Sequence, residues 1–134
     1  MNWITKYIKE NTFNWERILI DHDDNDVHCA RIKFGKFLFK TYGSTLEESY
    51  KTLESMTTLI KDFIKNNPES SEAIEIIADG DKFKFEIRCP EIPRYISSGS
   101  YMFKEEAAVY GVAQMALFYK KQKEKVKKNG FIAN

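Results

Sequence analysis

The sequence predicts an α+β fold in which antiparallel strands pack against two long helices. Apolar residues recur at helical spacing in residues 2–10, 45–65 and 101–128. Between these segments the apolar residues alternate with polar ones, as they do in half-buried strands. Two of the alternating segments meet at a glycine that favours a tight hairpin turn. The predicted order is therefore α-β-β-β-α-β-β-α, which is typical of the α+β class.

The length and charge of the chain indicate one ordinary globular domain over residues 1–134. A chain of 134 residues buries about two thirds of its unfolded surface, which is enough for a real core. The net charge is +1, so no overall field selects nucleic acid or an anionic membrane. No stretch is long enough to span a bilayer, and the first residues lack the apolar segment of a secretory signal. We therefore expect a cytoplasmic protein that has no membrane partner.

The first helix is predicted over Asn2–Glu10. Its apolar residues share one helical face and are Trp3, Ile4, Tyr7 and Ile8. Asn11 marks its end, because asparagine is a frequent residue at helix termini. This segment should form a short amphipathic helix.

Three strands follow and should form an antiparallel meander. The first contains Ile18 and Ile20, and the others cover residues 27–34 and 37–42. The turn at Gly35 and Lys36 has glycine at its first central position, as a type II′ turn requires. This register puts six residues on one buried face, namely Ala30, Ile32, Phe34, Phe37, Phe39 and Thr41.

The second helix should begin near Thr45, where Thr45 and Glu48 have the spacing of a capping box. Ser44 and Glu47 offer the same spacing one residue earlier. Its apolar residues recur every three or four positions and are Leu46, Tyr50, Leu53, Ile60 and Ile64. The segment from Asn66 to Pro68 ends it. This helix therefore lays one apolar stripe on the sheet.

A second hairpin is predicted over residues 74–87, with Asp79 and Gly80 at the centre of a type I′ turn. Its apolar face holds Ile74, Ile76, Ala78, Phe83, Phe85 and Ile87. A loop follows over residues 89–100, with a short edge strand near residues 94–97.

The last helix is predicted over residues 101–128, with Ser100 as its cap. Its first half should be buried and its lysine-rich end, residues 120–134, should project into water. Gly111 lies inside it and lowers helix propensity, which indicates close packing against another backbone.

This order of elements, at this length, resembles the topology of the type III secretion chaperones. Those proteins are small cytosolic dimers that bind extended segments of partner proteins. The resemblance is one of topology, and it implies a binding protein that forms a homodimer. Function has to be argued from specific residues, since one fold serves many functions.

The segment DHDDNDVHCA, residues 21–30, gathers both histidines of the chain and one of its two cysteines. An odd number of loop residues between the first two strands keeps their apolar residues on one face. His22 and His28 then lie opposite each other at the hairpin tip. Cys29 alternates to the other face, so it does not join them.

A metal site at this tip is one hypothesis. His22 and His28, with Asp24 or Asp26 as a further ligand, offer donors that suit Zn²⁺. The alternative is turn chemistry, because aspartate and asparagine tolerate left-handed geometry and bond their own backbone. A calcium loop does not fit. When its twelve positions are counted from Asp21, the position that requires glycine holds Asp26 and the position that requires glutamate holds Ile32.

The segment Lys120–Lys128 holds six lysines and one glutamate. Such a helix end offers salt-dependent binding to phosphates, so nucleic acid is an alternative partner. The other explanation is that the lysines complement the helix dipole and keep the end soluble. Residues 45–128 also resemble a double-stranded RNA-binding domain, but only Lys104 matches its basic helix start, and Glu105 and Glu106 would repel phosphate.

No nucleophile, base and orienting group stand together in this sequence, so catalysis has no support from it. The leading interpretation is a non-catalytic protein-binding factor, such as an adaptor, a chaperone-like factor, an inhibitor or an immunity-type protein. Its partner-binding residues are predicted among the outward Leu38 and the tyrosines, since tyrosine favours interfaces. These candidates are Leu38, Tyr42, Tyr95 and Tyr119.

Overall fold

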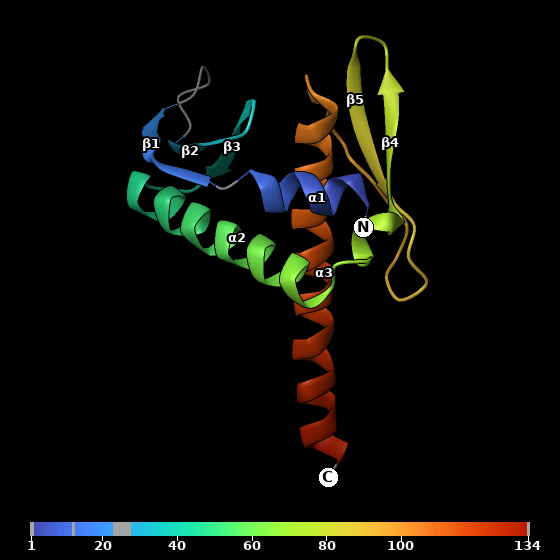
Figure 1. Ribbon diagram of the computed structural model, residues 1–134. Coiled ribbons are helices and arrows are strands. Elements are labelled where there is room, and N and C mark those ends of the chain that lie inside the picture. Colours follow the sequence, from blue (N-terminus) through green and yellow to red (C-terminus); the bar gives the residue numbers. More distant parts are fainter. Residues whose placement is uncertain (1, 12, 23–27, 134) are drawn as a thin grey trace. The chain divides into compact units, whose positions relative to one another are not determined.

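The computed structural model describes residues 2–11, 13–22 and 28–133 (Figure 1). The order of its helices and strands confirms the predicted α+β class, with antiparallel pairing throughout the described strands. The chain divides into two compact units, Met1–Glu69 and Ser70–Asn134. Each unit holds one three-stranded sheet and one long helix, and each is described by itself. The expectation of one domain stays a prediction.

Unit 1 consists of α1 (Trp3–Glu10), β1 (Phe13–His22), β2 (His28–Phe34), β3 (Phe37–Tyr42) and α2 (Leu46–Asn66). Its sheet has the order β1-β2-β3, and α2 packs against all three strands. The six residues predicted for the inner face of β2 and β3 are all buried. The predicted register of this hairpin is thereby confirmed.

The predicted end of α1 at Asn11 and the predicted cap of α2 at Thr45 are confirmed by their hydrogen bonds, and Asn2, expected inside the first helix, is its cap. The backbone N–H of Ile4 donates to the Asn2 side chain at 2.7 Å, and the Asn11 side-chain amide donates to the Tyr7 carbonyl at 2.9 Å. The N–H of Glu48 donates to the Thr45 hydroxyl at 3.0 Å. These polar side chains satisfy backbone groups that a helix end leaves without partners, and so they set where α1 and α2 begin and end.

The first strand begins earlier than the alternation at Ile18 and Ile20 indicates. It starts at Phe13, and its pairing with β2 shifts register between Asn14 and Leu19. The Phe13 ring packs on Phe34 with a centroid distance of 4.1 Å. Burying this ring extends the strand, whereas the irregular register hides the extension from a search for strict alternation.

Gly35 takes the positive φ that its turn requires, with a value of 64°. A Cβ atom at this position would lie 2.1 Å from the Tyr7 hydroxyl oxygen. Tyr7 also donates to the carbonyl of Phe34 at 3.4 Å. Glycine is therefore needed here both for backbone geometry and for the approach of α1 to the turn.

Unit 2 consists of the 3-10 helix η1 (Ser70–Ala73), β4 (Ile74–Asp79), β5 (Lys82–Ile87), β6 (Tyr95–Ile96) and α3 (Lys104–Ala133). The sheet order is β4-β5-β6, so the predicted short edge strand is confirmed. The predicted apolar face of the hairpin is also confirmed, because Ile74, Ile76 and Ala78 pair with Ile87, Phe85 and Phe83.

The turn between β4 and β5 lies one residue later than predicted. Asp79 pairs with Lys82, so the two central residues are Gly80 and Asp81 rather than Asp79 and Gly80. Gly80 has a φ of 65°. The pairing of the apolar residues sets the register, and the glycine then supplies the left-handed geometry at the first central position.

The last helix begins at Lys104 rather than at Tyr101, so Ser100 is not its cap. Tyr101 still belongs to the sheet, where its N–H and carbonyl exchange hydrogen bonds of 2.7 and 2.8 Å with Phe83. The Ser100 hydroxyl donates to Asp79 instead. The N–H of Met102 donates to the Glu106 carboxylate at 3.1 Å, which supports the helix start from inside the helix.

Glu86 is a buried carboxylate in unit 2 that joins β5 to the loop before β6. Its side chain accepts hydrogen bonds from Arg94, at 3.1 Å, and from Arg88, while the residue is only 1% exposed. These hydrogen bonds, that from Arg94 first, hold the pKa of Glu86 below its ordinary value of 4.5. A lowered pKa means that the pairing stabilises the fold above about pH 4.5 and is lost as the pH falls through the folded-state pKa.

We expect the Glu86→Gln variant to unfold at a lower temperature than the wild type at neutral pH, because Arg88 and Arg94 both lose the carboxylate of Glu86 as a partner. The difference should narrow as the pH falls through the lowered pKa of Glu86, since protonation removes the same charge from the wild type. Thermal unfolding followed by circular dichroism across this range measures it. Glu72→Gln, an exposed substitution in the same unit, is the control. A difference that stays constant with pH would contradict the assignment.

Candidate functional site

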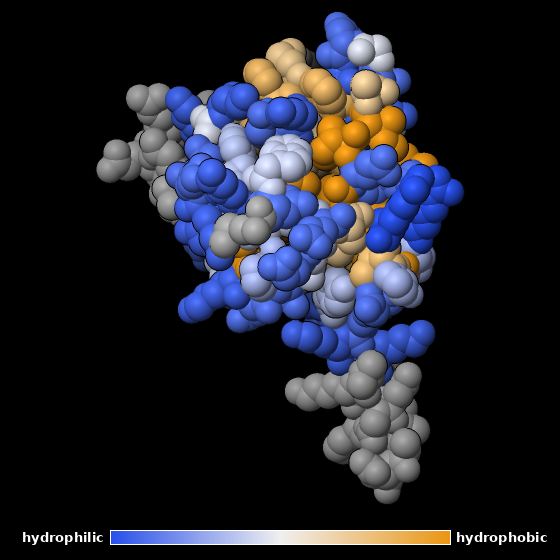
Figure 2. All heavy atoms as spheres, turned by 45° about the vertical axis from the view of Figure 1, so that its right-hand side comes forward, coloured by the Kyte–Doolittle hydropathy of each residue, from blue (hydrophilic) through white to orange (hydrophobic). Residues whose placement is uncertain are grey.

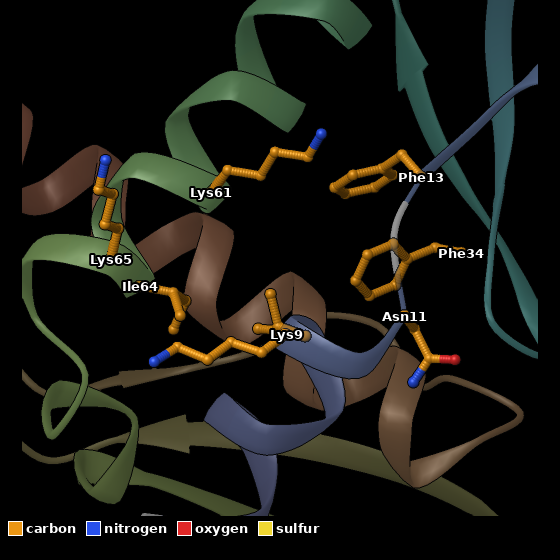
Figure 3. Close-up of a pocket in the computed structure, with 8 residues that line it drawn as sticks. Lys9, Asn11, Phe13, Phe34, Lys61, Ile64 and Lys65 are labelled. Carbon is orange, nitrogen blue, oxygen red and sulfur yellow. The ribbon is translucent and has the colours of Figure 1, made fainter.

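A pocket of about 400 Å³ opens in unit 1, within the size range of ligand sites (Figure 3). Its walls are apolar and its rim is basic. The lining residues are Ile8, Lys9, Asn11, Phe13, Phe34, Lys61, Ile64 and Lys65. No acidic residue is among them, so the pocket combines an apolar interior with three positive charges.

Four elements of unit 1 build this pocket. The end of α1 supplies Ile8 and Lys9, and the last turns of α2 supply Lys61, Ile64 and Lys65. The remaining walls come from the first residue of β1, the last residue of β2 and the cap of α1. Helix α1 is tied to its place at the β2–β3 turn, because the Tyr7 hydroxyl lies 3.4 Å from the carbonyl of Phe34 and from the N–H of Lys36.

The aromatic side chains of the apolar walls are packed on other rings. The Phe34 ring contacts Phe13, and it meets Phe37 and Tyr7 edge-on at 5.7 and 5.9 Å between centroids. Phe13 also meets Phe39 edge-on at 5.8 Å. Both wall rings are at most 5% exposed. Such interlocked aromatic rings hold one geometry and give a ligand a preformed surface.

The three lysines of the rim are exposed, whereas the walls are buried. The ammonium of Lys61 lies 5.9 Å from the centroid of the Phe13 ring, a cation–π distance (Figure 3). Lys61 and Lys65 stand one helical turn apart, where like charges repel. Within the described part of the chain no carboxylate pairs with these two lysines or with Lys9. The rim therefore attracts an anion.

The sequence did not indicate this pocket. Lys9, Lys61 and Lys65 look like ordinary solvated helix residues, and the walls look like ordinary core positions. The one available signal is that Lys61 and Lys65 flank the apolar Ile64 on one helix. Only the packing of α1 beside the end of α2 turns these residues into one site.

The backbone pairing of the two histidines is confirmed, since His22 lies opposite His28 where β1 ends and β2 begins. His28 is half-buried. The side chain of His22 and the whole of Asp24 lie outside the described residues. Among those that the structure does describe, no three His, Cys, Asp or Glu side chains are placed to hold a metal ion. The Zn²⁺ site therefore stays a prediction.

Two of the predicted partner-binding residues, Leu38 and Tyr42, lie on the outer face of β3. Leu38 is half-buried and Tyr42 is 49% exposed. Lys40 lies between them on the same face, because alternate residues of a strand share a side. The strand thus presents a narrow, partly apolar surface.

The other two predicted residues, Tyr95 and Tyr119, belong to unit 2 and make contacts within it. The Tyr95 ring stacks on Phe85 and meets Phe118 edge-on, with centroid distances of 5.8 and 5.6 Å. The Tyr119 hydroxyl lies 3.3 Å from the Cys89 sulfur. These contacts hold the loop after β5 against α3. A role in partner binding stays a prediction for both tyrosines.

Cys89 and Glu91 form a small polar cluster with Tyr119. The Cys89 thiol donates to the Glu91 carboxylate, and this hydrogen bond is the main reason why the pKa of Glu91 is lowered. The separate hydrogen bond between Tyr119 and Cys89, together with burial, raises the pKa of Tyr119. The cluster thus joins Cys89 and Glu91 of the loop to Tyr119 of α3.

The outer surface of the β4–β5 hairpin carries hydrophobic side chains below its polar tip (Figure 2). Ile96, which pairs with Glu86 and so shares its face, is 47% exposed.

The described lysine-rich part of α3, residues 120–125, is exposed apart from the half-buried Gln122. The prediction that this half of the helix projects into water is confirmed for these residues.

The fold and the pocket together define a small α+β protein with a lysine-rimmed apolar site. Comparison of the chain with protein families, with curated proteins and with solved structures found no match in any of the three. Across the described residues, no helix combines the length and apolar character needed to cross a bilayer.

Proposed function

We propose that this chain is a non-catalytic binding protein that acts by occupying part of the surface of a partner protein. The observation that supports this proposal is the pocket of unit 1, with its buried apolar walls and exposed polar rim. That arrangement is the anatomy of a protein interface, in which a central apolar pocket is surrounded by polar residues. The exposed Tyr42 adds a second apolar contact point.

The proposal places the protein in the cytoplasm, where free thiols such as those of Cys29 and Cys89 stay reduced. It also includes self-association as one form of binding, with the outer face of β3 as the contact surface. Leu38 and the exposed Tyr42 support this choice, because interfaces are enriched in tyrosine.

A photo-crosslinking residue placed at the pocket should capture the partner in the cells that make this protein. We expect the residue at position Lys65 to give a discrete product, and the same residue at Lys51 to give much less. Lys51 lies on the same helix but outside the pocket, where it pairs with Glu47 at 3.1 Å. Mass spectrometry then identifies the product.

A product of twice the chain mass would identify a second copy of the chain as the partner. Identical products from positions 51 and 65, or no product from either, would argue against a partner at the pocket.

A further inference from the structure

We infer that the pocket of unit 1 binds an acidic segment of another protein, which inserts one aromatic side chain between Phe13, Phe34 and Ile64. This inference rests on the proposed function and names the chemistry of the partner. It follows from the charge of the rim, the composition of the walls and the size of the pocket.

The rim selects an anionic ligand. Lys9, Lys61 and Lys65 bring three positive charges to one opening, and the lining residues include no carboxylate to balance them. The positive charges repel one another when the pocket is empty, most directly for the two lysines one turn apart on α2. Aspartate or glutamate residues of a ligand would relieve this repulsion and form new ion pairs at the rim.

The walls select an apolar group, and their rings favour an aromatic one. Phe13 and Phe34 are already held in tilted and edge-on contacts, and an aromatic side chain favours contacts of this kind with other rings. Ile8 and Ile64 complete an apolar surface on the helix side. A volume of about 400 Å³ accommodates a large side chain with part of the chain around it.

A folded or extended protein segment fits this combination better than nucleic acid does. Sequence-independent binding to nucleic acid uses a row of cations that follows the phosphates, with aromatic faces open for stacking. Here the cations surround one opening, and the faces of both wall rings are almost completely buried. An apolar anchor flanked by carboxylates matches one opening of this kind.

Selection from a displayed library of random short peptides, with the full chain as the target, tests this inference. We expect the enriched peptides to share an aromatic residue flanked by aspartate or glutamate. A synthetic copy of an enriched peptide should bind less tightly by about tenfold or more when its aromatic residue becomes alanine. Its affinity should also fall as salt is added.

Matched lysine variants of the chain locate the binding site. The Lys9→Gln/Lys61→Gln double variant removes one rim charge from α1 and one from α2. The Lys6→Gln/Lys51→Gln control removes one charge from each of the same helices outside the pocket, where the lysines pair with Glu10 and Glu47. We expect the rim variant to weaken peptide binding by about two- to thirtyfold, and the control to change it by less than about twofold. Circular dichroism confirms that both variants are folded.

Enriched peptides that are neutral or basic, or that bind the rim variant as tightly as the control, would overturn the inference. The proposed function would still stand if the crosslinker at Lys65 captures a protein. If no acidic peptide binds but dodecanoate binds in a lysine-dependent way, the inference is overturned in favour of a small amphipathic anion. If an oligothymidine probe binds in this way instead, it is overturned in favour of nucleic acid. Failure of all these probes to bind would overturn it as well.

Discussion

The Phe34→Ala variant is expected to lose about 3–5 kcal/mol of unfolding free energy, the usual cost of removing a buried aromatic ring. Phe34 is 1% exposed and contacts the rings of Phe13, Phe37 and Tyr7. Removing it leaves a cavity that its neighbours fill only in part. Denaturant unfolding of the purified chain, followed by circular dichroism and tryptophan fluorescence, measures the loss.

Two further variants give this prediction its controls. Lys33→Ala changes the exposed neighbour on the same strand and should alter stability by less than about 0.5 kcal/mol. Phe34→Leu keeps most of the buried volume and should lose clearly less than the alanine variant. A loss of less than about 1 kcal/mol for Phe34→Ala would show that this ring cluster does not organise unit 1.

The Gly111→Leu variant is expected to destabilise unit 2 by about 1–3 kcal/mol, because it forces a side chain into occupied space. A Cβ atom at Gly111 would lie 3.1 Å from Ile74 Cγ2 and 3.2 Å from Phe85 Cγ. The close packing predicted for this glycine is confirmed, although its neighbours are side chains of β4 and β5 rather than a backbone. Thermal and denaturant unfolding measure the effect.

Gly111→Ala separates crowding from helix propensity. Alanine favours the helix by about 1 kcal/mol over glycine, while its Cβ crowds Ile74 and Phe85 only slightly. We therefore expect a smaller change for alanine than for leucine, with the two effects of alanine opposing each other. A leucine variant as stable as the wild type would mean that α3 and the hairpin move apart easily.

Most elements of the fold were predictable because their signals are local. Asn2, Asn11 and Thr45 cap helices through backbone atoms only a few residues away, and Gly35 supplies a positive φ within its own turn. Alternation along β2 and β3 is likewise a property of consecutive residues. These interactions join residues that are close in sequence, so they form however the helices and sheets pack on one another.

The boundaries that were predicted wrongly depend on residues far apart in the sequence. Tyr101 stays in the sheet because it exchanges two hydrogen bonds with Phe83, and this pairing delays the start of α3. The β1 strand reaches back to Phe13 because that ring packs on Phe34. Phe83 and Phe34 lie too far along the chain from Tyr101 and Phe13 to fall within the short window over which a sequence pattern is judged.

The α+β class, the order of the elements and the inner faces of both hairpins could be predicted from the sequence, because periodicity and turn chemistry act over a few residues. The pocket forms only through the packing of distant segments. Lys9 and Lys61 belong to different helices, and Phe13 and Phe34 to different strands. Their side chains form one site only after hydrophobic burial brings α1, α2 and the sheet together, which no local pattern encodes.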